Sequence, residues 1–129
     1  MSPGAGAATP HRPSPAQIDA YGNLGFRFAG MSHRGSLLCL PDGIWAWPVN
    51  DVAGLTLAAL LPVFERGEIL DVFLLGVGRD PWPLPDRLRA RFRELSISVD
   101  TMPTGAAVRT YNILLAEDRR VGAGLIAVE

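Results

Sequence analysis

The chain has 129 residues, 48% of them hydrophobic, and its twelve basic and thirteen acidic residues leave a formal net charge of -1. This length and apolar content suffice for one domain with its own core, which excludes a chain that is disordered throughout. The balanced charge also excludes a general electrostatic attraction to nucleic acid or to an anionic membrane surface.

Residues 1–15, MSPGAGAATPHRPSP, are rich in proline, alanine and glycine and show no periodicity, which predicts a flexible tail. The segment has neither the basic start nor the apolar stretch of a signal peptide. The longest apolar run, VAGLTLAALLPVF, is interrupted by Pro62 and is shorter than the roughly 20 residues that span a bilayer. We therefore expect a single domain over residues 16–129 in a cytoplasmic protein that does not insert into a membrane.

The single cysteine, Cys39, excludes an internal disulfide and a paired-cysteine metal or redox site. It lies in the apolar run SLLCL, where we expect a buried hydrophobic side chain rather than a reactive thiol. This cysteine usage agrees with a reducing cytoplasm.

The first elements of the domain are expected to be strands. In GFRFAG, Phe26 and Phe28 alternate onto one face, which is typical of a strand. SLLCL and IWAWPV then flank Pro41-Asp42-Gly43, a turn sequence, and together they predict a β-hairpin with Trp45 and Trp47 on one face.

A helix is expected over residues 55–66, with Thr56 as its N-cap, Gly67 as its stop and a kink or break at Pro62. The continuous apolar run ILDVFLLGVG follows and predicts a central strand that is covered on both faces. After the proline-stiffened loop DPWPLP, a second helix should begin at Pro85. Its expected core stripe is Leu84, Leu88, Phe92 and Leu95.

SISVD predicts a short strand, and a third helix should run from Thr104 to about Asp118. VGAGLIAV then forms a last strand, in which Gly122 and Gly124 indicate a close approach of backbones. This alternation of strands and helices predicts a three-layer α/β domain with a mixed central sheet, an N-terminal β-hairpin and about three helices.

The glycines after the central strand raise the question of a ligand site. Gly76-Val77-Gly78 has the outline of a dinucleotide-binding fingerprint, but Pro81 occupies the third glycine position and the prolines delay the next helix. Nucleotide binding is therefore disfavoured. A crevice at a strand exit is still where α/β folds place ligands, and Arg79 lies beside it.

Catalytic signals are weak elsewhere in the chain. Ser32 and His33 are sequence neighbours without a nucleophile elbow, and no carboxylate pair or metal-binding cluster is recognisable. We predict no catalytic residue, no metal and no cofactor, so an enzyme is disfavoured. The second helix carries four arginines, for which a solvated face is favoured over a nucleic-acid patch. These are Arg87, Arg89, Arg91 and Arg93.

The third helix mixes a core stripe with polar residues. Its expected core positions are Ala107, Val108, Tyr111, Leu114 and Leu115. Asn112 falls at the border of this stripe, and Arg109, Ile113 and Glu117 form a row on the opposite side. An outward isoleucine indicates a further layer or a partner. Three interpretations remain open, namely polar residues that tie down neighbouring segments, a partner surface and a ligand site.

The same stretch resembles the signature of a family of small conserved proteins of unknown function. This family includes the mitochondrial complex I (NADH dehydrogenase) assembly factor 3 and an adipogenesis-associated human relative. The matching residues of the stretch are Met102, Thr104, Ala106, Ala107, Arg109, Thr110, Tyr111, Asn112, Leu114, Glu117, Arg119, Val121 and Ala123. Upstream, Ile18, Tyr21, Gly22, Phe26, Trp45 and Gly76-Val77-Gly78 fit in order, so the resemblance covers about residues 16–129.

Two positions depart from the family pattern: Val77 stands where many members have threonine, and Val108 where they have cysteine. Both changes remove a polar or reactive group, which weakens any chemical role for these positions. The resemblance implies a three-layer α/β fold and, for the mitochondrial relative, a role in assembling respiratory complex I.

Two functions follow as hypotheses. The first is a non-enzymatic interaction or assembly protein whose partners are respiratory-complex subunits or assembly proteins. The alternative is a small-molecule-binding protein or enzyme that uses the cleft at Gly76-Val77-Gly78. Nucleic-acid binding through the arginine-bearing helix is a third, weaker hypothesis. The predicted interaction or ligand surface consists of Gly76, Gly78, Arg79, Thr104, Arg109, Asn112, Ile113 and Glu117.

Overall fold

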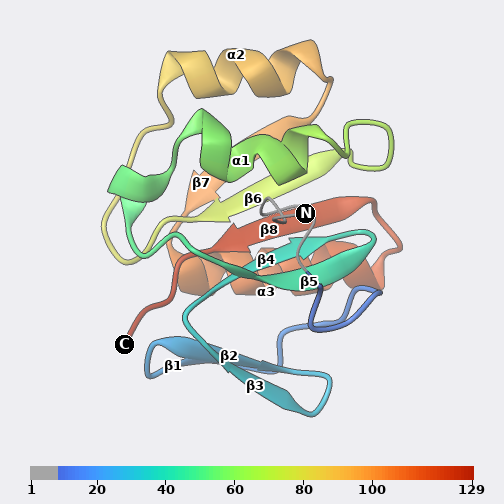
Figure 1. The fold of residues 1–129 in the computed structure, drawn as a ribbon, viewed down its shortest axis with the longest axis vertical. Coiled ribbons are helices and arrows are strands. Elements are labelled where there is room, and N and C mark those ends of the chain that lie inside the picture. Colours follow the sequence, from blue (N-terminus) through green and yellow to red (C-terminus); the bar gives the residue numbers. More distant parts are fainter. Residues whose placement is uncertain (1–8) are drawn as a thin grey trace.

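A mixed five-stranded sheet runs through the centre of the computed structural model, which describes residues 9–129 (Figure 1). Its strand order is β5-β4-β8-β6-β7. The strands are β4 (Ser36–Leu40), β5 (Gly43–Trp47), β6 (Val72–Gly76), β7 (Ser98–Met102) and β8 (Val121–Leu125). β4 is antiparallel to β5 and β8, whereas β6 is parallel to β7 and β8. The predicted mixed central sheet is therefore confirmed.

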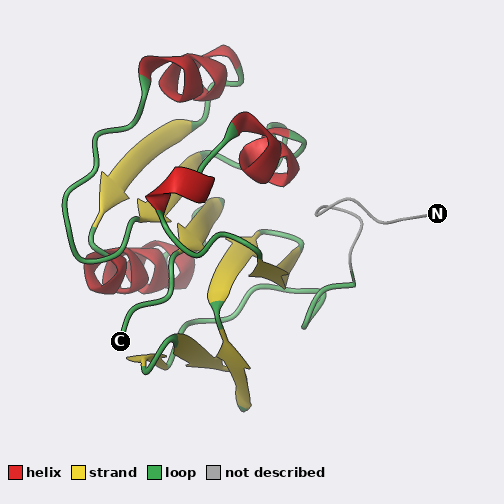
Figure 2. Ribbon diagram, turned by 60° about the vertical axis from the view of Figure 1, so that its left-hand side comes forward, coloured by secondary structure: helices red, strands yellow, loops and turns green. Residues whose placement is uncertain are grey.

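Helices cover both faces of this sheet, which gives the predicted three layers (Figure 2). α1 (Leu57–Phe64) and α2 (Asp86–Glu94) pack on one face, where their apolar residues join a core cluster with Phe73 and Leu75 of β6. α3 (Thr104–Ala116) packs on the other face. A short 3₁₀ turn, η2 (Val52–Gly54), precedes α1.

A second, three-stranded antiparallel sheet lies beyond α3 and β4 at the edge of the molecule (Figure 1). Its strands are β1 (Ala20–Gly22), β2 (Gly25–Phe28) and β3 (Met31–Arg34). The predicted strand GFRFAG corresponds to β2, and its Phe26 and Phe28 are both buried against Cys39 and Tyr111 in the second core cluster. The small sheet therefore belongs to the same core as α3.

The hairpin prediction is confirmed, because Leu40 pairs with Gly43 and leaves Pro41-Asp42 as the turn. Trp45 and Trp47 of β5 are both buried. The backbone of His11 and Arg12 hydrogen-bonds to Ile44 along the same strand. This contact falls in the second half of the predicted 1–15 tail, whereas residues 1–8 lie outside the described residues.

α1 begins where predicted, because the Thr56 hydroxyl accepts a hydrogen bond from the Ala59 amide at 3.1 Å. The helix ends at Phe64, before the predicted stop at Gly67, since the chain tightens into a three-residue turn with Arg66 N–H bonded to Val63 O. Pro62 lies within one uninterrupted helix, so the break considered at this residue does not occur.

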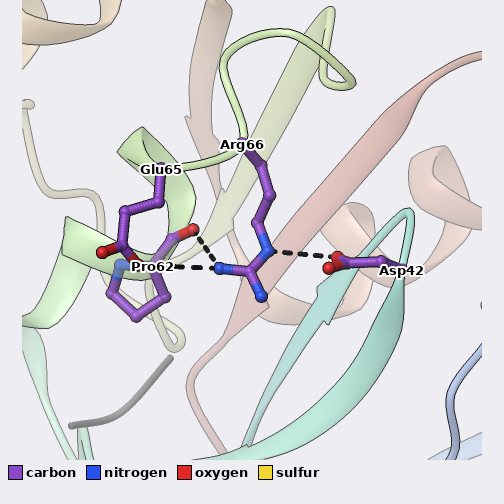
Figure 3. A network of polar contacts seen from close by, with 4 residues as sticks. All are labelled: Asp42, Pro62, Glu65 and Arg66. Atoms are coloured by element: carbon purple, nitrogen blue, oxygen red, sulfur yellow. Dashed lines mark hydrogen bonds and ion pairs between the residues drawn. The ribbon is translucent and has the colours of Figure 1, made fainter. Parts of the chain in front are cut away.

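Arg66 joins this helix end to the hairpin turn (Figure 3). Its Nε donates to Asp42 Oδ1 at 3.0 Å, and its Nη1 donates to the Pro62 carbonyl at 2.8 Å. The guanidinium also lies 5.0 Å from the centre of the Trp45 ring. A side chain near the surface thus fixes the position of α1 relative to β4 and β5.

None of the helices in residues 9–129 has the length and apolar character that crossing a bilayer requires. α2 carries its four arginines largely on the solvent side, and its Leu88 and Phe92 are fully buried as predicted. Arg91 pairs with Glu94 at 3.5 Å and lies over the Phe64 ring, so part of the arginine charge is engaged within the protein.

Candidate functional site

The exit of β6 is a tight junction between the central sheet and α3. A Cβ added at Gly76 would lie 3.0 Å from the Thr104 Cα and 3.2 Å from the Ala107 Cβ, so a larger residue does not fit without a shift. Two residues later, Gly78 adopts a φ of 96°, a conformation that favours glycine. These two glycines bring β6 against α3 and then turn the chain away from it.

Thr104 holds this junction together. Its buried hydroxyl accepts a hydrogen bond from the Gly78 amide at 3.0 Å and donates one to the Ile126 carbonyl at 2.8 Å. The Thr104 amide in turn donates to the Gly78 carbonyl at 2.9 Å. Thr104 therefore joins the segments that follow β6 and β8 to the start of α3, and its hydroxyl is occupied by protein groups.

Arg79 and Arg109 both line a depression of about 450 Å³, to which Gly78 and Tyr21 also contribute. Arg79 Nη2 donates to the Glu129 carbonyl at 2.8 Å. The Arg109 side chain has no hydrogen bond or ion pair with any other residue of the described range 9–129. Of the eight predicted surface residues, Gly78, Arg79 and Arg109 are thus brought together around one concave surface.

Asn112 does not face this depression. Its Oδ1 accepts from the Ile18 amide at 2.8 Å, and its Nδ2 donates to the Ile18 carbonyl at 2.9 Å. The Asn112 side chain thereby satisfies both backbone groups of Ile18, as a neighbouring strand would, in the segment that leads into β1. Of the three interpretations left open for the polar residues of α3, the first holds for Asn112, because its side chain ties down a neighbouring backbone segment.

The remaining two predicted residues lie on the outer side of α3. Ile113 is 59% exposed, and Glu117 is exposed where the helix ends. With Arg109 they form a line of side chains that we call the α3 row, defined as Arg109, Ile113 and Glu117. No other element of residues 9–129 covers the Ile113 side chain.

The structure offers little for acid-base, nucleophilic or metal chemistry. His33 Nε2 contacts the Ser36 carbonyl at 3.0 Å and its Nδ1 contacts His11 at 3.0 Å, so neither ring nitrogen is directed to Ser32. Cys39 is fully buried, and burial raises the pKa of its thiol to about 12. Within residues 9–129 no three His, Cys, Asp or Glu side chains are grouped to hold a metal ion.

One neighbouring feature was missed by reasoning from the sequence. Trp82 and Met102 line a second depression of about 340 Å³, with Val77 and the prolines on either side of Trp82. A tryptophan in a proline-rich loop directly after a strand exit was the available signal. Its neighbour Met102 is 20 positions away along the printed sequence, and only the parallel pairing of β6 with β7 brings the two together.

The family model for proteins of unknown function DUF498/DUF598 matches residues 18–126, which covers the sheet, its helices and the α3 row. The chain belongs to the DUF498/DUF598 family. An uncharacterized family relative from Rhodobacter capsulatus is 39% identical over 110 residues, which are 84% of this chain and 82% of that protein. The resemblance noted from the sequence is thereby confirmed.

The NADH dehydrogenase [ubiquinone] 1 alpha subcomplex assembly factor 3 of Drosophila melanogaster is also similar to this DUF498/DUF598 chain. It is 29% identical over 114 residues, which cover 84% of this chain but only 57% of that longer protein. The assembly factor therefore contains sequence that has no counterpart in the match.

Solved structures share the same architecture. A protein of Bartonella henselae, described as an outer membrane protein, is 52% identical with a TM-score of 0.88, covering 92% of this chain and 100% of its own. A protein of Rhodopseudomonas palustris is 49% identical with a TM-score of 0.82, covering 94% and 90%. The protein MT938, at 13% identity and a TM-score of 0.58 over 88% of this chain and 99% of its own, shares the fold alone.

Proposed function

We propose that this DUF498/DUF598 protein is a non-enzymatic interaction protein that assists the assembly of respiratory complex I. The observation that carries the proposal is the exposed Ile113 at the centre of the α3 row. The similarity to the assembly factor 3 of Drosophila melanogaster supports the choice of complex I. The proposal places the protein in the cytoplasm, where it meets respiratory-complex subunits or assembly proteins transiently.

The chemistry of the α3 row suits a small docking surface. Covering the Ile113 side chain with a partner removes apolar surface from water, which contributes on the order of 1.5–3 kcal/mol for a fully buried side chain of this size. Arg109 and Glu117 carry opposite charges one turn to either side, and such charges orient a partner more than they add affinity. A weak, transient contact of defined orientation is what this combination supports.

The test is affinity capture of the tagged chain from detergent-solubilised membranes, followed by identification of the recovered subunits by mass spectrometry. We expect recovery of complex I subunits with the wild-type chain and their loss with Ile113→Asp. The matched control is Leu61→Asp, which places the same charge at a 52% exposed leucine of α1 on the other face of the sheet. This control should retain the subunits.

Two results would overturn the proposal. One is the recovery of no respiratory subunits together with unchanged complex I levels in a deletion strain. The other is an equal loss of the subunits with Ile113→Asp and Leu61→Asp, because the capture would then not depend on the α3 row.

A further inference from the structure

The carboxyl ends of three parallel strands meet at one edge of the central sheet (Figure 1). Gly76 at the end of β6 is in register with Met102 at the end of β7 and with Leu125 at the end of β8. In open α/β sheets, ligands bind in the crevice outside such carboxyl ends. Three depressions surround the β6 exit at this edge, and neighbouring ones share lining residues.

One of these depressions is apolar. Its volume is about 340 Å³, and Trp82 and Met102 line it together with Val77. Pro81 and Pro83 hold the Trp82 loop in a restricted conformation. A partly exposed indole beside a thioether and two proline rings presents a surface that suits a flat apolar group.

The adjacent depression is cationic. Its volume is about 450 Å³, and it is lined by Arg79, Arg109 and Tyr21. Pro103 lines both this depression and the apolar one, so the two share a wall. The Tyr21 ring lies directly against Gly105, where a Cβ would collide with the phenol oxygen. Tyr21 therefore contributes a phenol side chain to the lining of the cationic depression.

The charges at this edge are divided between two sides. Among the described residues, Glu129 is the one acidic residue that lines the cationic depression, whereas Asp51 and Asp80 line the third depression together with Glu129 and Arg79. Arg79 already donates to the backbone oxygen of Glu129, whereas no hydrogen bond or ion pair of the Arg109 side chain is found within residues 9–129. The Arg109 guanidinium is therefore the group in this depression that is available to an anion. An anionic group is favoured there and disfavoured on the side of the two aspartates.

We propose that this edge binds an amphipathic organic anion. Its acidic head group lies between Arg79 and Arg109, and its flat apolar part lies against Trp82 and Met102. The combined volume of the two adjoining depressions is of the size that small-molecule sites have. This proposal goes beyond the assembly role and does not depend on it. Arg109 belongs to both surfaces, but Ile113 and Glu117 take no part in the site.

A larger depression of about 630 Å³ at the other end of the parallel strands does not carry the same inference. Most of its ionisable lining groups are already paired. Arg66 contacts Asp42 and Glu65 (Figure 3). Glu94 is paired with Arg91.

The experiment uses a matched pair of fluorescent probes, 1-anilinonaphthalene-8-sulfonate and the uncharged N-phenyl-1-naphthylamine, which differ by the sulfonate. We expect the double substitution Arg79→Gln/Arg109→Gln to raise the dissociation constant of the sulfonate probe at least about tenfold. The dissociation constant of the uncharged probe should change by less than about twofold. Trp82→Ala should weaken both probes. In amide NMR spectra, the sulfonate probe should shift the signals of Gly78 and Gly105 first.

The charge control is Arg89→Gln/Arg93→Gln, which removes two exposed arginines of α2 that line none of the three depressions. The proposal would be overturned if this control lowered the affinity for the sulfonate probe as much as Arg79→Gln/Arg109→Gln does. It would also be overturned if the Arg79/Arg109 variant bound the sulfonate probe as tightly as the wild type. Arg79→Gln alone separates this site from the assembly role. It should weaken the sulfonate probe and leave the capture of respiratory subunits unchanged, because Arg79 is not part of the α3 row.

Discussion

The Thr104 hydroxyl and the Gly78 amide are hydrogen-bonded at 3.0 Å, and the Thr104 amide returns a bond to the Gly78 carbonyl at 2.9 Å. This reciprocal pair connects the exit of β6 to the first residue of α3 across 26 positions of the chain. The same hydroxyl donates to Ile126 beyond β8. The Thr104 hydroxyl therefore serves both as a donor and as an acceptor in holding this edge of the sheet together.

Replacing Thr104 with valine should destabilise the protein by about 1–3 kcal/mol, since the Gly78 amide and the Ile126 carbonyl lose their buried partner while the shape is preserved. Chemical denaturation monitored by circular dichroism measures the change. Thr104→Ser keeps the hydroxyl and should recover most of the lost stability. A valine variant as stable as the wild type would show that these hydrogen bonds contribute nothing net.

Asn112 offers a test of side-chain chemistry at constant shape. Asn112→Asp keeps the acceptor for the Ile18 amide but places a second oxygen against the Ile18 carbonyl, so the 2.9 Å hydrogen bond becomes a repulsion. We expect a loss of about 1–2 kcal/mol in the free energy of unfolding at neutral pH, comparable to that of Asn112→Ala. If Asn112→Asp leaves stability unchanged while Asn112→Ala lowers it, the hydrogen bond from Asn112 Nδ2 to the Ile18 carbonyl does not contribute to stability.

The close packing around the glycines of β8 predicts that adding a single methyl group there lowers the stability of the protein. A Cβ at Gly124 would lie 2.6 Å from Trp47 Cη2 and 3.1 Å from Phe73 Cζ, so Gly124→Ala should cost about 1–3 kcal/mol by overpacking. Gly67→Ala is the control, because there the nearest atoms are 3.6 Å away. Thermal or chemical unfolding should show a loss for the first variant and little change for the second. Equal effects would contradict the tight packing at β8.

Cys39 should be inert in the folded protein. Because burial raises the pKa of its thiol to about 12, almost no thiolate is present near neutral pH, and the side chain is also inaccessible. A disulfide reagent such as Ellman's should label no thiol in the native state at about pH 8 and one thiol per chain after denaturation. Rapid labelling without denaturant would mean that β4 opens readily.

His11 gives the contact between residues 9–15 and β5 a dependence on pH. Desolvation and the neighbouring His33 lower the pKa of His11 from 6.5. The unfolded segment therefore takes up a proton first, so the contact is fully stabilised above about pH 6.5 and weakens as the pH falls through the lowered pKa. The protection factor of the Ile44 amide, which donates to the Arg12 carbonyl at 3.1 Å, reports on this contact.

We expect the protection of the Ile44 amide to fall as the pH is lowered from about 6.5 to about 5, and His11→Gln should remove this dependence because glutamine does not titrate in that range. Protection that is constant over the same range in the wild-type chain would argue against a role for His11.

Several elements of the fold depend on residues that are close together in the sequence, and these elements could be predicted. The Thr56 cap, the Pro41-Asp42 turn and the apolar run that becomes β6 each depend on neighbours within a few residues. The split of α3 into a buried stripe and an outer row follows from helical periodicity alone, and the burial of Tyr111 and the exposure of Ile113 agree with it.

The parts that could not be predicted depend on contacts between distant segments. The strand MSHR of β3 has no apolar alternation, and it forms because β2 provides its hydrogen-bonding edge. The partner of Asn112 lies 94 positions away, and a border position on a helix does not reveal which segment it will bind. The approach of Trp82 to Met102 likewise requires the order of the parallel strands.

The position of β8 also has a consequence for how the protein is made. β8 is the last of the strands to be synthesised, yet it lies between β4 and β6 in the finished sheet. Until β8 takes its place, β4 and β6 each lack the strand that pairs with them in the finished sheet, and an unpaired strand edge can pair with another chain. We therefore expect a chaperone that shields strand edges to matter most before β8 has joined β4 and β6.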